Sequence, residues 1–223
     1  MSATVLRAAR SAPPATEVRV LPSLTVELHD ATPTDAPVIA AIYNASLRSL
    51  PYQATPEGAT QGAHWLASEL RALGDSAQAP RGNHLGPWSV RMMAEWIAMH
   101  ERAGRRLWLA LVDGEPVGWL SFLGFCDRPG GAGTAEVAFY VAPRWHRRGV
   151  GRFMLEQALL TAPQWRIDRL MAFVWHDNAA SLALLQRAGF REWGRLPGAI
   201  EAFGKRRDMV IAGIELAERA ANA

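Results

Sequence analysis

The chain has 223 residues and a hydrophobic content of 49%, which is enough for one domain with a sizeable core. Its formal net charge is only +3, and the sequence pI near 9.6 comes almost wholly from arginine, because Lys205 is the only lysine. This positive excess is too small and too dispersed to predict a nucleic-acid-binding protein. The single cysteine, Cys126, excludes an internal disulfide framework and fits a reducing, cytoplasmic location. No stretch is long and apolar enough to predict a membrane-spanning helix.

Residues 1–23 contain Ser, Ala, Pro and Arg without a hydrophobic period, and they predict a disordered N-terminal tail. An arginine-rich, acid-poor start is also typical of a transit peptide, but a glutamate at position 17 and paired prolines favour the tail. Residues 24–28 alternate between apolar and polar positions and predict a strand. Thr32 is expected to be the N-cap of a helix, because Pro33 follows it and Asp35 lies at the third helical position.

Residues 50–90 are rich in Gly, Pro, Ala and Gln, and they predict loops with one short helix. A longer helix is predicted over residues 89–102, where apolar residues recur at helical spacing. Residues 107–112, 116–123 and 137–141 predict an antiparallel meander, in which Asp113-Gly114 forms the first hairpin turn.

The C-terminal third predicts strands over residues 170–175, from Phe190 onward and over residues 207–216. A helix over residues 178–188 separates the first two of these strands, and residues 217–223 are expected to fray. The six histidines are scattered along the chain without metal-ligand spacing, so we predict no metal site.

The stretch from Ala135 to Leu160 joins a buried strand to a helix through a basic turn. Pro143 ends the strand, since proline cannot donate to a β-ladder. The turn has the sequence His146-Arg147-Arg148-Gly149-Val150-Gly151-Arg152. The free N–H groups and positive dipole of the helix start, with arginine side chains beside them, predict an anion site. Its two glycines are expected to let the backbone approach a phosphate closely.

This turn resembles the pyrophosphate loop of the GNAT superfamily of acyl-CoA N-acyltransferases, Gln/Arg-x-x-Gly-x-Gly/Ala, with His146 at the first position. A second block, Asn178-Ala179-Ala180-Ser181 followed by Arg187-Ala188-Gly189-Phe190, resembles the superfamily's Asn-x-x-Ser … x-x-Gly-Phe segment. A third, Asp30-Ala31-Thr32 and Ala41-Ile42-Tyr43-Asn44, resembles the opening of the phosphinothricin-acetyltransferase-like branch. That branch acetylates the amino group of small amino-acid-like molecules.

The resemblance implies the GNAT fold, an α/β (α+β) architecture with flanking helices and a mixed central sheet of about 6–7 strands. Its fourth and fifth strands would run parallel and splay apart. The implied domain covers residues 24–216, with an inserted helical segment at about 50–105. That segment is interpreted either as an elaborated acceptor pocket or as a surface helical hairpin.

The resemblance also implies acetyl-CoA as the acyl donor, with its pantetheine arm on the main chain of the fourth strand and its pyrophosphate at the basic turn. The cofactor-binding residues that it implies are Phe139, Tyr140, Val141, His146, Arg147, Arg148, Gly149, Val150, Gly151, Arg152, Asn178 and Ser181. Asn178 is also expected to be a helix N-cap.

Acetyl transfer to an amine needs a proton acceptor, because an alkylammonium has a pKa of about 10. Glu136 is the candidate base, since it matches the glutamate of the branch's Ala-Glu-x-x-x-Tyr-Val motif; the alternative is an exposed glutamate at a strand start. The general acid is not assigned, because Leu185 stands where the superfamily has Tyr or His. Tyr140 and Cys126 are alternatives, but packing is the favoured interpretation of each of them.

The predicted function is therefore an acetyl-CoA-dependent N-acetyltransferase whose acceptor is the primary amine of a small amino-acid-like molecule. Tyr43 and Asn44 are the candidate acceptor-binding residues. Two alternatives remain open: a protein or peptide N-acetyltransferase, and a non-catalytic acyl-CoA-binding module. The identity of the acceptor, the acyl chain length and a homodimeric state are also left open. No nucleic acid, membrane or metal partner is expected.

Overall fold

The computed structural model describes residues 17–21, 24–48, 88–125, 131–202 and 205–216. The predictions for residues 1–16, for the inserted residues 50–87, for Cys126 and for residues 217–223 lie outside these ranges. The strands are β1 (Glu17–Leu21), β2 (Leu24–Asp30), β3 (Leu107–Val112), β4 (Glu115–Gly124), β5 (Thr134–Val141), β6 (Arg169–Trp175), β7 (Arg191–Ala202) and β8 (Lys205–Glu215). The helices are α1 (Ala36–Arg48), α3 (Val90–Arg102), α4 (Val150–Thr161) and α5 (Ala179–Arg187).

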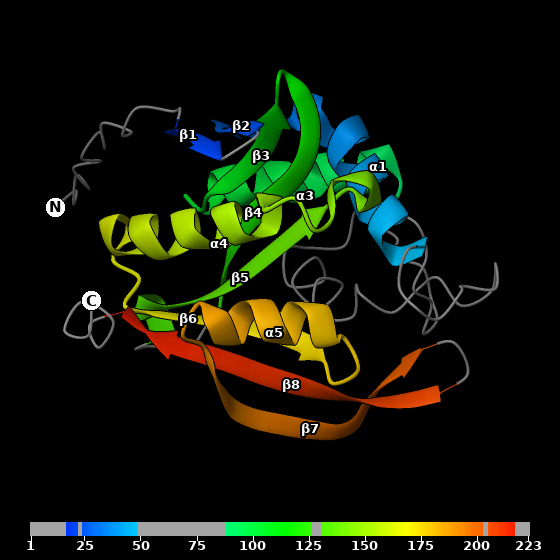
Figure 1. The fold of residues 1–223 in the computed structure, drawn as a ribbon, viewed down its shortest axis with the longest axis vertical. Helices are drawn as coiled ribbons and strands as arrows, with labels where there is room; N and C mark the ends of the chain where they lie inside the picture. Colours follow the sequence, from blue (N-terminus) through cyan, green and yellow to red (C-terminus); the bar gives the residue numbers. More distant parts are fainter. Residues whose placement is uncertain (1–16, 22–23, 49–87, 126–130, 203–204, 217–223) are drawn as a thin grey trace, which may run out of the picture.

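The described strands form one eight-stranded sheet in the order β1-β2-β3-β4-β5-β6-β8-β7 (Figure 1). Neighbouring strands run antiparallel, except for β5 and β6, which are parallel. The predicted mixed sheet with one splayed parallel pair is therefore confirmed. Because β1 adds a strand at the edge, the sheet has eight strands instead of about six or seven, and the parallel pair is the fifth and sixth.

The prediction that residues 1–23 form a disordered tail is wrong for Glu17–Leu21. This segment pairs antiparallel with β2, from Glu17 opposite Leu28 to Leu21 opposite Leu24. The sequence EVRVL carries the period-2 alternation of a strand. Its short length and its basic, proline-rich surroundings concealed that signal.

Helix and turn boundaries follow from local chemistry. The Asp35 carboxylate accepts the Thr32 backbone N–H at 2.8 Å in a short 3₁₀ turn, Pro33–Asp35, that leads directly into α1. Ser89 caps α3, because its hydroxyl accepts the Met92 N–H. Asp113 and Gly114 both have positive φ, 51° and 78°, as a type I′ hairpin turn requires.

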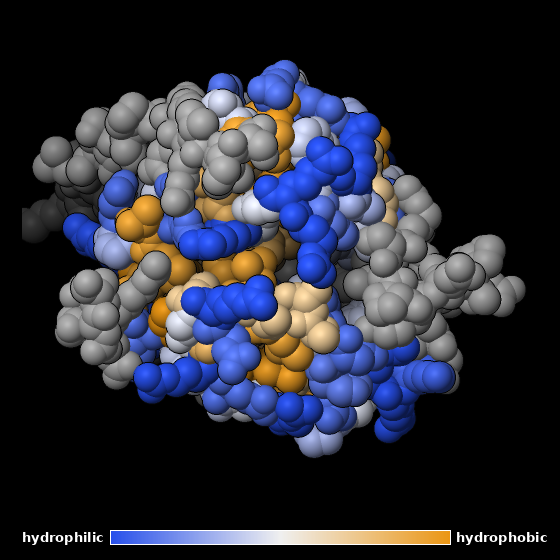
Figure 2. Space-filling model, viewed as in Figure 1, coloured by the Kyte–Doolittle hydropathy of each residue, from blue (hydrophilic) through white to orange (hydrophobic). Residues whose placement is uncertain are grey.

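Two hydrophobic clusters lie on opposite faces of the sheet. One contains the buried side chains of α4 and those of strands β2 to β6 and β8, with Phe153, Leu155 and Leu170 at its centre. The other joins α1 and α3 to β3 and β4. Figure 1 shows the resulting layers, with α4 and α5 on the near face and α1 and α3 on the far face. Hydrophobic residues cross the middle of the near face in Figure 2, with hydrophilic residues on both sides.

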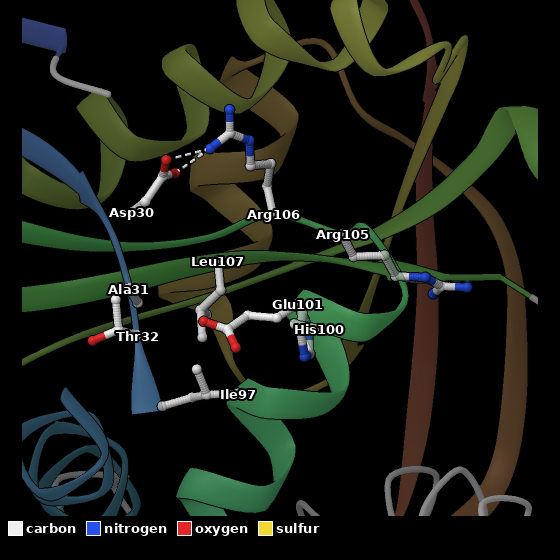
Figure 3. A pocket seen from close by; sticks show the side chains of 9 residues that line it. All are labelled: Asp30, Ala31, Thr32, Ile97, His100, Glu101, Arg105, Arg106 and Leu107. Atoms are coloured by element: carbon white, nitrogen blue, oxygen red, sulfur yellow. Dashed lines mark hydrogen bonds and ion pairs between the residues drawn. The ribbon is translucent and has the colours of Figure 1, made fainter. Parts of the chain in front are cut away.

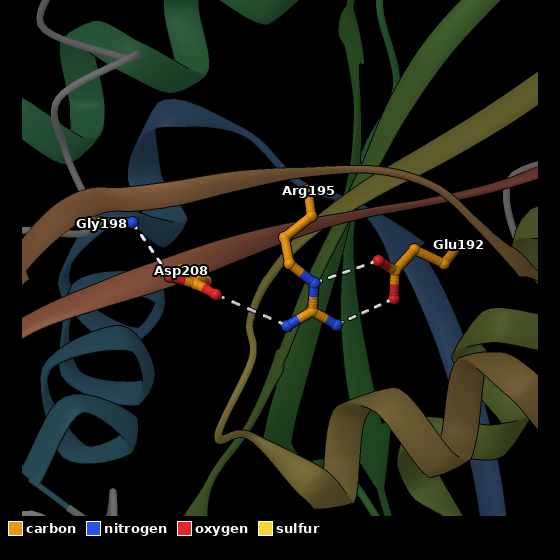
Figure 4. A network of polar contacts seen from close by, with 4 residues as sticks. All are labelled: Glu192, Arg195, Gly198 and Asp208. Carbon is orange, nitrogen blue, oxygen red and sulfur yellow. Dashed lines mark hydrogen bonds and ion pairs between the residues drawn. The ribbon is translucent and has the colours of Figure 1, made fainter.

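A polar network ties the long β7–β8 hairpin together (Figure 4). The Arg195 guanidinium donates two hydrogen bonds to Glu192, at 3.1 and 3.0 Å, and lies 3.6 Å from Asp208 on the neighbouring strand. Asp208 also accepts the backbone N–H of Gly198 at 2.9 Å. This network spans the irregular register between Leu196 and Ile200, where main-chain pairing is interrupted.

Candidate functional site

The parallel pairing of β5 and β6 is short. It includes only three residue pairs and ends where Glu136 lies opposite Met171. Beyond that point β5 continues to Val141 alongside β4, while β6 continues to Trp175 alongside β8. The two strands therefore diverge, and beyond this point one edge of β5 has no partner among the described strands.

The alternation of the β-ladder tells which main-chain groups face this opening. The Ala142 N–H donates to the Val117 carbonyl of β4, so the main-chain groups of Tyr140 also point toward β4. Those of Phe139 and Val141 point the other way, toward the opening. Of the three residues expected to bond the pantetheine arm, these two have the required direction, and Tyr140 does not.

Glu136 lies at the vertex of the splay and is buried, with 7% of its surface exposed. The alternative interpretation as an exposed strand-start glutamate is therefore wrong. Alternation places its side chain with Ala138 and Tyr140, on the face that α1 and α3 cover. Burial raises the pKa of Tyr140, and the nearby Glu136 carboxylate raises it further, so the two side chains are electrostatic neighbours.

The basic turn has the geometry of an anion site. Gly149 is the N-cap of α4 with a φ of 91°, and within the described part of the chain the helix start has no side-chain cap. The first helical hydrogen bond runs from the Phe153 N–H to the Gly149 carbonyl, so the N–H groups that precede it point out of the helix end. Arg147 adopts a φ of 62°, an uncommon conformation for a residue with a side chain, and it is exposed. A diphosphate fits these donors by charge and direction.

Other side chains of the turn are held by protein groups. His146 Nε2 donates to the Val141 carbonyl at 2.8 Å, and Arg148 stacks on Trp145 at 5.0 Å. Arg152 pairs with Glu156 at 2.7 Å. His146 thus supports the end of β5, and we assign it to positioning the turn instead of touching a ligand.

Gly151 differs from Gly149. A Cβ atom at Gly151 would meet the side chains of Leu184, Val141 and Phe139 at 3.4–3.8 Å, so this glycine faces α5 and β5 instead of the helix end. The expectation that both glycines let a phosphate approach therefore stays a prediction for Gly149, whereas Gly151 faces protein side chains. The three apolar side chains form a wall beside the opening between the strands.

The second motif lies at the start of α5. Asn178 is the N-cap, as expected, and its side chain accepts the Ser181 N–H at 3.2 Å. Leu185, at the position of the superfamily's acid, is 2% exposed in the core and has no proton to give.

The two acceptor candidates on α1 differ in what they contact. Asn44 forms a pair of hydrogen bonds with the main chain of Trp88, donating to its carbonyl at 3.0 Å and accepting its N–H at 2.8 Å. Its amide therefore positions Trp88 and is not directed at a substrate. Tyr43 is buried against Tyr140 and Trp88, with ring centroids 5.0 and 5.8 Å away. Burial raises its pKa well above the ordinary value.

Sequence reasoning gave no site role to Trp88, Trp96 or Ser46. Trp88 and Trp96 belong to the aromatic cluster around Tyr43; Trp88 lies just before the α3 N-cap, and Trp96 lies in the middle of that helix. The Ser46 hydroxyl lies 3.1 Å from the Val141 carbonyl, so α1 reaches the end of β5. No local sequence pattern signals that contact.

A separate cavity of about 230 Å³ lies between the last turn of α3 and the start of β3 (Figure 3). Asp30 and Arg106 form an ion pair on its border, and Glu101 and His100 project from α3. It contains none of the site residues predicted from the sequence. Burial lowers the pKa of His100 to about 4, so the ring is neutral near pH 7.

Across the described ranges, no three His, Cys, Asp or Glu side chains are grouped closely enough to hold a metal ion. A search of the helices in those same ranges finds none with the length and hydrophobicity needed to cross a membrane.

Comparisons with known proteins agree with this geometry. The sequence profile of the Acetyltransferase (GNAT) family matches residues 70–190. YwnH of Bacillus subtilis (strain 168), named provisionally as a phosphinothricin acetyltransferase, is 42% identical over 123 residues, which cover 55% of this chain and 75% of YwnH. The L-amino acid N-acetyltransferase AaaT of Escherichia coli (strain K12) is 30% identical over 103 residues, covering 46% of this chain and 62% of AaaT.

Solved structures show the same fold. A crystal structure described provisionally as a phosphinothricin N-acetyltransferase superposes with a TM-score of 0.67 at 31% identity, covering 86% of this chain and 98% of the other. The phosphinothricin acetyltransferase of Sinorhizobium meliloti, solved in complex with acetyl-CoA, superposes with a TM-score of 0.66 at 18% identity, covering 85% and 88%. Sequence profile, relatives and architecture coincide, and the chain belongs to the acetyltransferase (GNAT) family.

Proposed function

We propose that this protein transfers the acetyl group of acetyl-CoA to the primary amine of a small, amino-acid-like acceptor. The position of Glu136 carries the proposal. This buried carboxylate stands at the last β5–β6 pair, where the strands part, and it faces the aromatic side chains under α1 and α3. The names of YwnH and AaaT support the acceptor class.

Acetyl-CoA would lie along the edge of β5. Its diphosphate would be held by the free N–H groups of α4 and by Arg147. Its extended arm would follow Phe139 and Val141, whose main-chain groups face the opening. From Val141 back to Glu136 the strand rises about 17 Å, a span that an extended pantetheine arm can cover. The thioester would then lie beside Glu136.

Glu136 would act as the base. An acceptor amine is an ammonium at neutral pH and must lose a proton before it attacks a thioester. The Glu136 carboxylate accepts that proton, the amine nitrogen bonds to the acetyl carbon, and the CoA sulfur leaves as a thiolate. The bonded nitrogen then loses its second proton as the amide forms, and the leaving thiolate takes this proton directly or through water. Tyr140 lies near Glu136, but burial and the Glu136 charge raise its pKa and make it a weaker proton donor.

The test is Glu136→Gln, which keeps the size of the side chain and removes the base. A thiol-release assay would screen free amino acids, phosphinothricin analogues, polyamines and short peptides, and calorimetry would measure acetyl-CoA binding. We expect kcat to fall by about 100-fold or more, while acetyl-CoA affinity stays within two-fold. Glu201→Gln, an exposed glutamate on β7, is the matched control and should keep full activity.

Two outcomes would contradict the proposal. If Glu136→Gln retains its kcat, another group accepts the proton. If the unsubstituted protein binds acetyl-CoA but releases thiol with no member of the panel, the small-amine acceptor is wrong and a macromolecular acceptor or a binding role replaces it.

A further inference from the structure

Five aromatic rings near Glu136 form a closed circuit, which we call the aromatic box. They come from four elements and one helix start that are far apart in sequence. The members of the box are Tyr43 of α1, Trp88 before α3, Trp96 of α3, Trp119 of β4 and Tyr140 of β5. Four of them are only 2–6% exposed, and Tyr140 is partly buried at the strand that borders the splay.

Each ring of the box contacts the next. The centroid distances around the circuit, starting from Tyr43–Trp88 and ending at Tyr140–Tyr43, are 5.8, 6.0, 5.4, 4.6 and 5.0 Å. A cation held against any of these rings would lie within the ~6 Å range of a cation–π contact.

The contacts between neighbouring rings are mostly edge-to-face. Four of the five interplanar angles lie between 64° and 81°, and the fifth pair, Trp119 and Tyr140, is stacked at 27°.

Tryptophan at three positions of the box is unfavourable for the stability of the fold. The indole N–H groups of Trp88, Trp96 and Trp119 are buried, and none of them has a hydrogen-bond partner among the described residues. Phenylalanine or leucine would fill a core without leaving a desolvated donor. Tryptophan has the aromatic face that attracts cations most strongly, so three tryptophans favour a cation site over plain packing.

Charges of both signs lie near the box. Glu136 lies beside Tyr140 and contributes negative potential on that side, whereas the positive charge of Arg105 acts on His100 beside Trp96. The arginines that stack on tryptophans in the described residues lie over Trp108, Trp145, Trp165 and Trp175, all outside the box. His100, whose ring is 4.2 Å from Trp96, is neutral near pH 7 because burial lowers its pKa.

We propose that the aromatic box binds the acceptor amine in its ammonium form, next to the carboxylate that takes its proton. The proposal rests on the transfer function above and specifies how the acceptor is recognised. The box selects alkylammonium ions, and it discriminates against amines that are uncharged at neutral pH.

The kinetic consequence separates this role from a structural one. The box stabilises the cation, which exists before proton transfer, and it does not stabilise the neutral amine that attacks. Weakening the box therefore raises the KM for the acceptor about ten-fold and leaves kcat unchanged or higher. A variant that merely loosens the fold would lower kcat and raise the KM for acetyl-CoA as well.

The binding test uses two probes that differ in a single atom. Choline carries a quaternary nitrogen, and 3,3-dimethylbutan-1-ol has carbon in its place with the same shape and no charge. Tryptophan fluorescence and calorimetry on the full chain would measure both affinities. We expect choline to bind at least ten-fold more tightly. Equal affinities, or no binding of either probe, would overturn the proposal.

Substitutions inside and outside the aromatic box test where the preference for choline arises. Trp119→Leu and Trp88→Phe should each reduce the preference for choline to three-fold or less. Trp108→Phe is the matched control, because Trp108 packs on Phe122 on the opposite face of the sheet, and it should keep the full preference. A preference that survives in both box variants, with circular dichroism spectra unchanged, would place the cation elsewhere and overturn the assignment.

These measurements need no turnover, so they are independent of the transfer reaction. If choline binds more tightly than the uncharged probe but no amine is acetylated, the box binds cations and the proposed transfer function is wrong. If small amines are acetylated but the two probes bind equally, the transfer function stands and the proposed role of the box is wrong.

Discussion

At Gly149 the backbone takes a φ of 91°, in the left-handed region that glycine adopts without steric cost. Two positions later Gly151 is helical and faces the side chains of α5 and β5. The two glycines of one short motif therefore have different physical requirements. One supports a backbone conformation at the anion site, and the other permits close packing.

Alanine substitutions separate these two requirements. Gly149→Ala should reduce the free energy of unfolding by about 1–2 kcal/mol, because a Cβ atom is strained at that φ. It should also lower acetyl-CoA affinity at least five-fold as the helix start shifts. Gly151→Ala adds a methyl group at ordinary contact distances and should change both quantities little. Thermal unfolding and calorimetry measure them, and equal acetyl-CoA affinities in the two variants would contradict the assignment of the anion site.

At the scale of elements, α1 is joined to the rest of the site by two polar contacts. Asn44 holds the main chain of Trp88 at the start of α3, and Ser46 lies within hydrogen-bonding distance of the Val141 carbonyl at the end of β5. The same carbonyl accepts the His146 ring N–H from the basic turn. Helix α1 thus contacts the start of α3, on the face proposed to bind the acceptor, and the end of β5, which precedes the proposed anion site.

Asn44→Ala should therefore affect the two substrates unequally. Losing two hydrogen bonds to a partly buried main chain should cost about 2 kcal/mol of stability. Trp88 would lose its anchor, so the KM for the acceptor should rise several-fold, while the KM for acetyl-CoA stays within two-fold. Asn44→Asp keeps one acceptor and is the intermediate control. A rise confined to the acetyl-CoA KM would show that Asn44 serves the other side of the site.

At the scale of the whole molecule, stability should fall on acidification in two stages. Burial lowers the pKa of His100 from its ordinary value of 6.5 to about 4. Between these values the unfolded chain binds a proton that the folded chain does not, so folding weakens as pH falls from about 6.5 to 4. The shift corresponds to a loss of roughly 3 kcal/mol.

The second stage belongs to Asp208, whose pKa the Gly198 N–H lowers, so its stabilisation is lost as pH falls further. Denaturant unfolding at a series of pH values measures the first stage. His100→Gln should flatten the slope between pH 6.5 and 4, and Asp208→Asn should leave that interval unchanged. Parallel slopes for the His100 variant and the unsubstituted protein would contradict the assignment.

Much of the fold was predictable because its signals are local. The Asp113-Gly114 turn, the Thr32 cap and the alternation in β3 and β5 depend on a few adjacent residues, and the structure confirms them. Strand β1 was missed, because it is stabilised by pairing along the edge of β2 and not by a strong pattern of its own.

The site was predictable only in part. The family resemblance pointed to Glu136 and to the turn around Gly149, whose roles stay predictions. It could not give the direction of the Tyr140 main chain, which depends on the register with β4. It also could not assemble the aromatic box, because Trp88 and Trp119 meet only through tertiary packing with Trp96.

The short β5–β6 pairing also predicts where the sheet should open most easily. Three residue pairs join these strands, whereas seven join β4 to β5 and seven join β6 to β8. The sheet therefore consists of two extensively paired halves that are joined by a short parallel contact, and Glu136 lies at the end of that contact. Native-state hydrogen exchange should show the lowest protection of strand amides at the β5–β6 pairing. Slow separation of the two halves of the sheet would provide a route for release of the CoA product.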